Sequence, residues 1–243
     1  MPMPGLLARL TADPGRPRLT WYGDDGERVE LSGHVLDNWV TKTANLLVEE
    51  YQAGPLTRVL LDLPVHWRSV VWAMATWRVG ACVTFPPAGR PDLVVTHQPV
   101  RHVEGGVDVV AVALPALARS IEGELPAGAV DATSAVMTYG DLLTWMPEPS
   151  PAAPALKAGE SLVAHASLES WALGVLGRHG ECPPGGRLLV CVPADAYEDG
   201  LGLALAALAL DGSVVLCAPG IDVMARQRIA RAELVVAQVV TGD

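Results

Sequence analysis

A strand–helix–strand pattern between residues 58 and 85 constrains the fold of this chain more than any other feature. Residues 58–63 are a short, largely apolar run of the kind that forms a strand buried on both faces. Residues 67–79 follow with helical spacing, and residues 81–85 form the next strand, closed by two prolines. Because both connections are short, we expect these strands to pair in parallel through a right-handed crossover. The pattern therefore predicts an α/β fold.

The rest of the chain extends this pattern. Two short extended runs, 18–22 and 27–31, flank an Asp-Gly turn at residues 23–26, which predicts a hairpin. The other expected strands are 92–96, 107–112, 161–164, 187–192, 213–217 and 234–240. The other expected helices are 6–10, 35–48, 114–121, 167–178, 197–210 and 222–231. Together these elements predict two sheets rich in parallel βαβ units, arranged in αβα layers.

A stretch rich in proline and alanine at residues 147–160 divides the pattern into two halves. Such a composition is typical of a linker. At about 150 residues per domain, a chain of 243 residues accommodates one large domain or two small ones. We therefore expect a first α/β subdomain with the hairpin at 1–146, a linker at 147–160 and a second α/β subdomain at 161–243.

Composition excludes several classes of function. The formal net charge is −10, from 27 acidic and 17 basic residues, and a uniformly basic nucleic-acid-binding surface does not fit this balance. The four cysteines form no C-x-x-C pair, so we expect reduced, mostly buried thiols and no metal site. The first residues lack a secretion signal, and the longest apolar stretch, 201–210, is too short to cross a bilayer. These features predict a cytoplasmic protein without a membrane span.

No common catalytic motif is present, but a polar cluster follows one expected strand. The sequence lacks a phosphate loop of the P-loop type, a dinucleotide glycine fingerprint, a nucleophile elbow and a zinc-protease helix. Asp195, Tyr197 and Asp199 precede or begin the helix after strand 187–192. Carboxylates at this position favour the helix dipole. The alternative is a polar rim at the carboxyl end of a parallel strand, where α/β folds bind ligands.

Two histidines, His97 and His102, are five residues apart across a proline. That spacing places them on no shared face of a helix or strand. A structural or surface role is therefore favoured over metal binding.

Several short segments of the first half occur in the order and spacing of one enzyme superfamily. They are LTWY from residue 19, VELSGHVLD from 29, NLL from 45, RVLLDLP from 58 and WRVGACVTFP from 77. In these segments the chain resembles the start of the adenylate-forming superfamily, which includes acyl-CoA synthetases and nonribosomal-peptide adenylation domains. It is most similar to a group of shortened relatives within that superfamily.

The second half carries the resemblance further. Its matching segments are SLVAHASL from residue 161, RLLVCVP from 187 and LDGSVVL from 210. The resemblance implies the fold of the N-terminal part of an acyl-CoA synthetase. It also implies that residues 150–159 stand in the place of the family's phosphate loop, with Lys157 nearest to the position of the loop lysine and His165 in the segment that follows.

The chain departs from this family where ATP would bind. The family's phosphate loop is rich in serine, threonine and glycine because backbone N–H groups and hydroxyls enclose the phosphates. Residues 150–159 are rich in proline and alanine, which remove N–H donors and hydroxyls. Counted back from His165, Lys157 is two positions early. Residue 243 also precedes the family's segments for adenine, ribose, magnesium and the catalytic lysine.

These matches and departures predict a non-catalytic, vestigial acyl-CoA synthetase-like domain that acts through a protein partner, a second copy or a retained small ligand such as ATP or AMP. No catalytic residue is assigned. The candidate ligand-binding residues are Lys157, His165, Asp195, Tyr197 and Asp199. One alternative is a nucleotide- or acyl-binding half-enzyme, completed by another chain and adenylating a carboxylic acid. Another is a structural subunit, with the last strand as a pairing edge.

Overall fold

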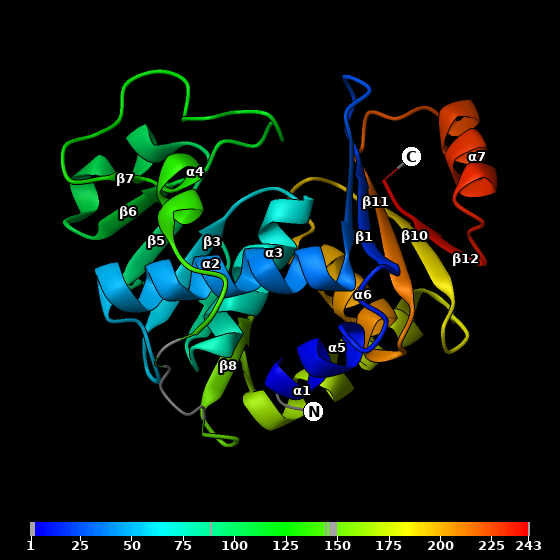
Figure 1. Cartoon of the computed structure of the whole chain (residues 1–243), viewed down its shortest axis with the longest axis horizontal. Coiled ribbons are helices and arrows are strands. Elements are labelled where there is room, and N and C mark those ends of the chain that lie inside the picture. The colour runs from blue at the N-terminus through cyan, green and yellow to red at the C-terminus, as the bar shows by residue number, and fades with distance from the viewer. Residues whose placement is uncertain (1–2, 88, 144, 146–149, 243) are drawn as a thin grey trace. The chain divides into compact units, whose positions relative to one another are not determined.

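The computed structural model describes residues 3–87, 89–143, 145 and 150–242 and has a mixed α/β fold with two sheets (Figure 1). The longer helices are α1 (Met3–Leu10), α2 (Gly33–Tyr51), α3 (Trp67–Arg78), α5 (Leu168–His179), α6 (Tyr197–Ala209) and α7 (Val223–Ala232). The short helical turns are η1 (Pro99–Gly105), α4 (Ala132–Ala135), η2 (Val136–Thr138) and η3 (His165–Ser167). The α/β fold class expected from the sequence is confirmed.

Residue contacts divide the chain into two units, each built from segments distant in sequence. Unit 1 comprises Met1–Asp37, Pro64–Val70 and Ser167–Asp243, and unit 2 comprises Asn38–Leu63 and Val71–Ala166. Helices α2 and α3 each continue from one unit into the other. The division expected from the sequence instead follows chain order, with one subdomain at 1–146 and the other at 161–243.

Unit 1 contains a five-stranded sheet in the order β12-β10-β11-β1-β2. Its strands are β1 (Pro17–Tyr22), β2 (Arg28–Ser32), β10 (Arg187–Cys191), β11 (Ser213–Cys217) and β12 (Ala237–Val240). β1 and β2 form the predicted antiparallel hairpin, with Trp21 opposite Val29. β1 also pairs in parallel with β11, Leu19 lying opposite Val214. The N-terminal hairpin therefore belongs to the sheet of the C-terminal strands.

Unit 2 contains a seven-stranded sheet in the order β7-β6-β5-β3-β4-β8-β9. Its strands are β3 (Arg58–Asp62), β4 (Cys82–Thr84), β5 (Leu93–Thr96), β6 (Asp108–Ala111), β7 (Val130–Asp131), β8 (Pro154–Ala158) and β9 (Ser161–Ala164). β3 pairs in parallel with both β4 and β5, so the predicted βαβ unit is confirmed. The helix expected at residues 114–121 is absent, because Pro115 begins a turn that Ala118 closes.

The expected linker contains a strand. Residues 147–149 lie outside the described residues, but β8 pairs with β9 in an antiparallel ladder and with β4 in parallel. Pro154 is the first residue of β8, a position where a strand tolerates proline. Ala155 and Leu156 are fully buried, which favours a strand over a solvated linker.

Close packing in unit 1 explains the glycines of α6. A Cβ atom on Gly200 would lie 2.5 Å from Val65, and one on Gly202 would lie 2.6 Å from Val175. The run from Gly200 to Ala209 is buried throughout, as its apolar composition predicts. All four cysteines are free and buried. No described helix has the length and hydropathy of a membrane span.

Candidate functional site

The candidate site of unit 2 is built at the carboxyl ends of two neighbouring parallel strands. β3 and β5 run in register, with Leu60 opposite Val94 and Asp62 opposite Thr96. Alternate residues of a strand point to the same face, so each apolar residue shares its face with the polar residue two positions later. The sequence therefore provides an apolar floor that ends in a polar rim. Ligands of open α/β sheets bind at this end of the strands.

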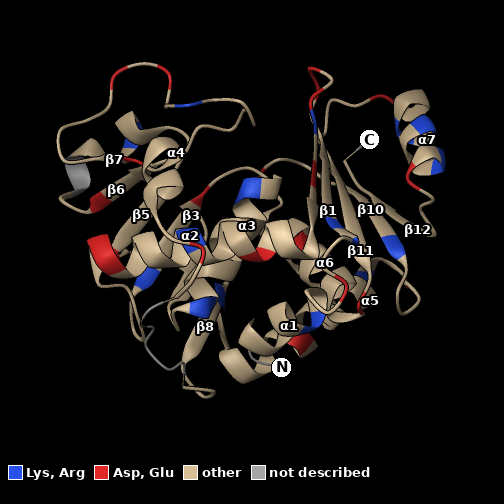
Figure 2. Ribbon diagram, in the orientation of Figure 1, with Lys and Arg blue, Asp and Glu red and all other residues tan. Residues whose placement is uncertain are grey.

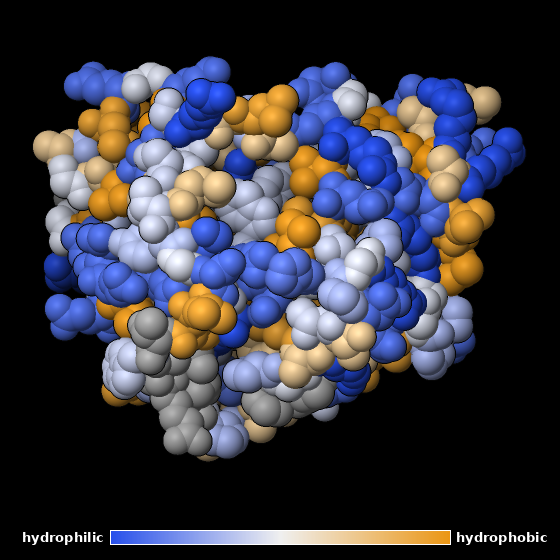
Figure 3. Space-filling view, viewed as in Figure 1, coloured by the Kyte–Doolittle hydropathy of each residue, from blue (hydrophilic) through white to orange (hydrophobic). Residues whose placement is uncertain are grey.

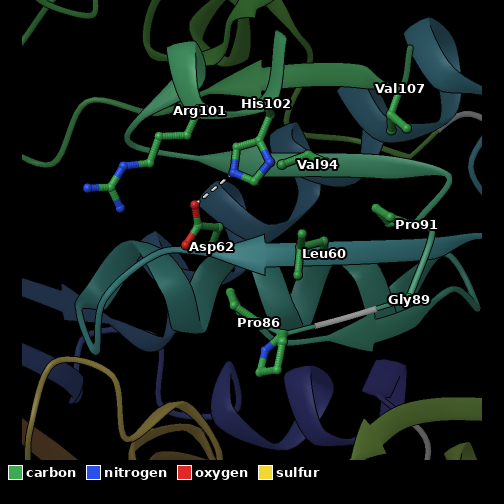
Figure 4. Close-up of a pocket in the computed structure, with 10 residues that line it drawn as sticks. Leu60, Asp62, Pro86, Gly89, Pro91, Val94, Arg101, His102 and Val107 are labelled. Carbon is green, nitrogen blue, oxygen red and sulfur yellow. Dashed lines mark hydrogen bonds and ion pairs between the residues drawn. The ribbon is translucent and has the colours of Figure 1, made fainter. Parts of the chain in front are cut away.

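A pocket of about 480 Å³ lies over this face (Figure 4). Leu60 and Val94 form its apolar floor. One wall is the segment after β4, with Pro86, Pro87, Gly89 and Pro91. The other wall is formed by Arg101 and His102 of η1 and by Val107, the residue before β6. A volume of this size is in the usual range for small-molecule sites, roughly 300–1,000 Å³. The pocket can hold a small molecule that has both an apolar and an anionic part.

Asp62 is the centre of the polar rim. The Thr96 hydroxyl and the His102 ring nitrogen Nε2 both donate to Asp62 Oδ2, each at 2.9 Å. Nδ1 of His97 donates to the backbone carbonyl of Asp62 at 3.2 Å. The Asp62 and His102 side chains are 17% and 23% exposed, so the pair is shielded but open to a ligand. Asp62 thereby fixes the orientation of the His102 ring and leaves Nδ1 of that ring for another group.

Arg101 supplies a cationic group at the rim. It precedes His102 in η1 and is exposed; its backbone N–H donates to Gln98, whereas its side chain forms no hydrogen bond or ion pair among the described side chains. Figure 4 shows its side chain at the same end of the pocket as Asp62 and His102. An exposed guanidinium and an oriented imidazole that line one pocket suit phosphate or carboxylate oxygens. No cluster of three or more metal-binding side chains occurs among the described residues.

Two of the candidate residues from the sequence, Lys157 and His165, lie in unit 2. Lys157 is half-buried in β8, opposite Leu162 of β9. His165 is buried after β9, and burial lowers the pKa of its ring below the usual value, although hydrogen bonds to the backbone of Gly80 and Ala81 act in the opposite direction. Neither residue lines the pocket described above.

The other three candidates, Asp195, Tyr197 and Asp199, lie in unit 1 where α6 begins. Asp195 is exposed and Tyr197 is half-buried. Asp199 accepts a hydrogen bond from Arg178 of α5 at 3.3 Å and lies 3.3 Å from Nε2 of His179 in the same helix, and so joins two helices of unit 1. Within unit 1, Asp199 therefore has a structural role whether or not it also contacts a ligand.

The sequence did not single out Asp62, Arg101 and His102 as site residues. A signal was present, because Asp62 is a carboxylate at the end of a buried parallel strand. The contact with His102 could not be inferred from spacing, since η1 has to bring the histidine back over β5. The hydrogen bond from His102 to Asp62 agrees with the structural role favoured for this histidine. The same side chain also lines the pocket.

Comparisons with known proteins identify the fold. No family model matches the chain. A protein of Mycobacterium tuberculosis, named only for its family, is 37% identical over 150 residues, which are 58% of this chain and 60% of that protein. The chain thus matches less than two thirds of this relative's length.

Solved structures extend the similarity over nearly the whole chain. Acyl-CoA synthetase from Brucella canis superposes with a TM-score of 0.74 at 18% identity, over 96% of this chain and 46% of that one. Acetoacetyl-CoA synthetase from Streptomyces lividans gives 0.73 at 18%, over 97% and 41%. A mutant amide bond synthetase from Marinactinospora thermotolerans gives 0.67 at 17%, over 98% and 48%.

These superpositions define an α/β protein with the fold of the N-terminal part of acyl-CoA synthetases. The expected resemblance is confirmed at the level of the fold. The chain spans somewhat less than half the length of these three solved structures.

Proposed function

We propose that this chain is a non-catalytic acyl-CoA synthetase-like domain that binds the phosphorylated nucleotide end of coenzyme A, or of an acyl-CoA, in the unit 2 pocket. The observation that carries the proposal is that one pocket with an apolar floor is lined by the exposed side chain of Arg101 and by an imidazole that Asp62 orients. Two of the structurally similar proteins are synthetases of CoA thioesters by name. A protein with this ligand would act in the cytoplasm.

The chemistry of coenzyme A matches the two parts of the pocket. Its nucleotide carries phosphates, which a guanidinium binds through paired N–H donors. Its adenine ring is flat and apolar on both faces, which suits the floor formed by Leu60 and Val94. A protonated His102 would add a second charge-assisted hydrogen bond to a phosphate oxygen.

The absence of adenylation in this proposal rests on the residues that precede β9. Residues 150–159 place prolines and alanines where a phosphate loop would need N–H groups and hydroxyls. In the structure, part of this segment is strand β8, whose backbone groups pair with β9 and β4. Backbone groups used in a ladder cannot also enclose phosphates.

Isothermal titration with coenzyme A tests the proposal directly. We expect saturable binding that Arg101→Ala weakens by about tenfold or more, because one charge-assisted contact to phosphate is lost. Arg119→Ala is the matched control, since Arg119 is an exposed arginine of the same unit that does not line the pocket. Binding that is equally strong in the Arg101 variant, or absent from the parent chain, would contradict the proposal.

Pyrophosphate release tests the non-catalytic part separately. The purified chain, given ATP, magnesium and a panel of carboxylic acids, should release no more pyrophosphate than a heat-inactivated sample. Release above that level would overturn the non-catalytic assignment, and release only after a second chain is added would support the alternative, a half-enzyme completed by another chain. In that case Lys157, His165, Asp195, Tyr197 and Asp199 become the first positions to substitute. The alternative rests on the similarity to solved synthetase structures, and this chain covers less than half of the length of each.

A further inference from the structure

The pocket of unit 2 has a cationic end and an apolar end, with the pair of Asp62 and His102 between them. Figure 4 shows Arg101 on one side of this pair and Leu60 and Val94 on the other. Among the described residues that line the pocket, polar side chains belong to Asp62, Arg101 and His102, and the others are leucine, valine, proline and glycine. A ligand group at the apolar end therefore has to be recognised by the polar group that faces it.

A chain of hydrogen bonds determines which nitrogen of His102 carries the proton. The backbone N–H of Gln98 donates to the hydroxyl oxygen of Thr96 at 3.0 Å, and that hydroxyl donates to Asp62 Oδ2 at 2.9 Å. A carboxylate can only accept, so it also accepts from the ring of His102. The proton of the neutral ring therefore lies on Nε2, which is 2.9 Å from the same carboxylate oxygen, and Nδ1 is left as an acceptor.

Nδ1 of His102 faces the apolar end of the pocket. Figure 4 shows this nitrogen turned away from Asp62, on the side of Val94, whereas the carboxylate of Asp62 lies on the side of Arg101. No hydrogen bond joins Nδ1 to any residue that the structure describes, and the side chain is 23% exposed. An accessible acceptor in this position is complementary to an N–H or O–H donor of a ligand.

The floor of the pocket is suited to a flat ring. Leu60 and Val94 are 7% and 3% exposed, since both lie in strands that are paired on both sides. On the face of the molecule drawn in Figure 3, hydrophobic side chains occur in separate groups among hydrophilic ones. Scattered apolar residues of that kind are common on proteins and do not indicate a ligand, whereas an apolar floor inside a pocket favours burial of an apolar ring face.

Charges of both signs are interspersed over the elements of unit 2 (Figure 2). Long-range attraction of a phosphorylated ligand is weak over such a surface, because the opposite charges offset each other. Discrimination between similar nucleotides then depends on short-range contacts inside the pocket. Such contacts discriminate strongly between a donor and an acceptor, because a shielded polar group that is left unpaired costs free energy.

We infer that His102 makes the unit 2 pocket selective for an adenine base over a 6-oxopurine base, by accepting a hydrogen bond at Nδ1 from the exocyclic amino group of adenine. The inference rests on the proposed function, in which the adenine of coenzyme A lies over Leu60 and Val94. The amino group of adenine donates, whereas the carbonyl oxygen of hypoxanthine or guanine at the same position only accepts. A 6-oxopurine therefore sets two acceptors against each other at Nδ1.

Isothermal titration of the full chain with three forms of one ligand tests the inference. The ligands are coenzyme A, its deaminated form with a hypoxanthine base, and its 2′-deoxy form. The titrations are made at about pH 8.5, above the range in which an ordinary histidine takes up a proton, because a protonated ring would donate at both nitrogens. We expect the deaminated form to bind about tenfold more weakly than coenzyme A or worse, and the 2′-deoxy form to bind as coenzyme A does.

The outcomes separate this inference from the proposed function. Equal binding of coenzyme A and its deaminated form would overturn the selectivity assigned to His102 and leave the proposed function intact. Weaker binding of the 2′-deoxy form alone would assign Nδ1 to the ribose hydroxyl and would also overturn it. Absence of binding by coenzyme A itself would overturn both.

His102→Gln tests the inference on the side of the protein. An amide side chain can present either its oxygen or its N–H groups to a ligand, so the variant should bind coenzyme A and the deaminated form with similar affinity. His97→Gln is the matched control, because His97 also bonds to Asp62, at the backbone carbonyl, but does not line the pocket. The control should keep the preference for adenine. If His102→Gln keeps it too, another group recognises the base and the inference is wrong.

Asp62→Asn tests the positioning role of Asp62. Asparagine can donate to Nε2 of His102 as well as accept from it, so the ring proton is no longer confined to Nε2. We expect the ratio of the two affinities, for coenzyme A and for its deaminated form, to fall towards one. A purely structural role of Asp62 would weaken both ligands alike and leave the ratio unchanged, and that result would overturn the positioning role.

Discussion

His165 makes unfolding of this protein sensitive to acid. The residue is 4% exposed, and no described group hydrogen-bonds its Nε2. Burial holds the pKa of the folded ring below that of the unfolded chain, because a buried charge lacks solvation. Below the unfolded value of about 6.5, the unfolded chain takes up a proton that the folded chain does not. The contribution of His165 to stability is therefore full above that pH and is lost as pH falls towards the folded pKa.

The variant His165→Asn should show a weaker loss of stability on acidification. Asparagine can replace the ring hydrogen bonds to the backbone of Gly80 and Ala81 without carrying a titratable group. Urea unfolding at about pH 7 and about pH 5 measures the difference in the free energy of unfolding. If parent and variant lose the same stability between these two pH values, His165 is not the group responsible.

Contacts of single residues also show what the sequence alone could not predict. The spacing of His97 and His102 favoured a structural or surface role, and both rings do bond to Asp62. The approach of His102 to Asp62 depends on η1 returning over β5, and this is a contact between residues forty positions apart. Such contacts follow from the tertiary fold, and no local pattern in one sequence encodes them.

At the scale of elements, α6 shows how packing overrides helix propensity. Glycine is less favourable than alanine inside a helix by about 1 kcal/mol. Gly202 is nevertheless required, because a Cβ atom there would lie within 2.9 Å of three atoms of Val175 in α5. Gly174 in α5 has open space around it, and a Cβ atom at that position would meet nothing within 4 Å.

These two glycines provide opposite predictions for the same substitution. Gly202→Ala should reduce the free energy of unfolding by about 1–3 kcal/mol through overpacking. Gly174→Ala should increase it by about 0.5–1 kcal/mol, because alanine is the better helix former. Chemical unfolding of both variants measures the change. Adding Val175→Ala to the Gly202 variant should restore part of the loss; no recovery would indicate a different cause.

Elements with strong periodic patterns were predicted well, and those that depend on partners were not. The hairpin, the βαβ unit around α3 and the buried helix α6 are all confirmed. The strand β8 was not predicted because its sequence neighbourhood is rich in proline. Its formation depends on pairing with β4, where Leu156 lies opposite Val83. The helix expected at 114–121 is wrong because residues 115–118 form a turn, in which Leu117 is 93% exposed.

At the scale of the whole molecule, the sheet of unit 1 depends on both ends of the chain. β1 lies between β11 and β2, so the C-terminal strand β11 has a neighbour from the N-terminal part of the chain. Val214, Val215 and Leu216 of β11 are fully buried. A fragment of residues 161–243 would leave this strand without β1 on one side.

We therefore expect the fragment 161–243 to be unfolded or aggregated when expressed alone. Co-expression with residues 1–160 should restore a soluble complex, because β1 can then pair with β11. Circular dichroism and sedimentation of the fragment with and without the first part measure this. A fragment that is folded and monomeric alone would show that the division expected from the sequence describes an autonomous domain.

The pairing of β1 with β11 also determines when the sheet of unit 1 can form during synthesis. Leu19 and Val214 face each other although they are ~195 residues apart, and a ribosome adding about 5–20 residues per second needs roughly 10–40 s to join them. Throughout that time the first hairpin has left the ribosome without its neighbour. The nascent chain therefore exposes the apolar side chains of β1 until β11 has emerged.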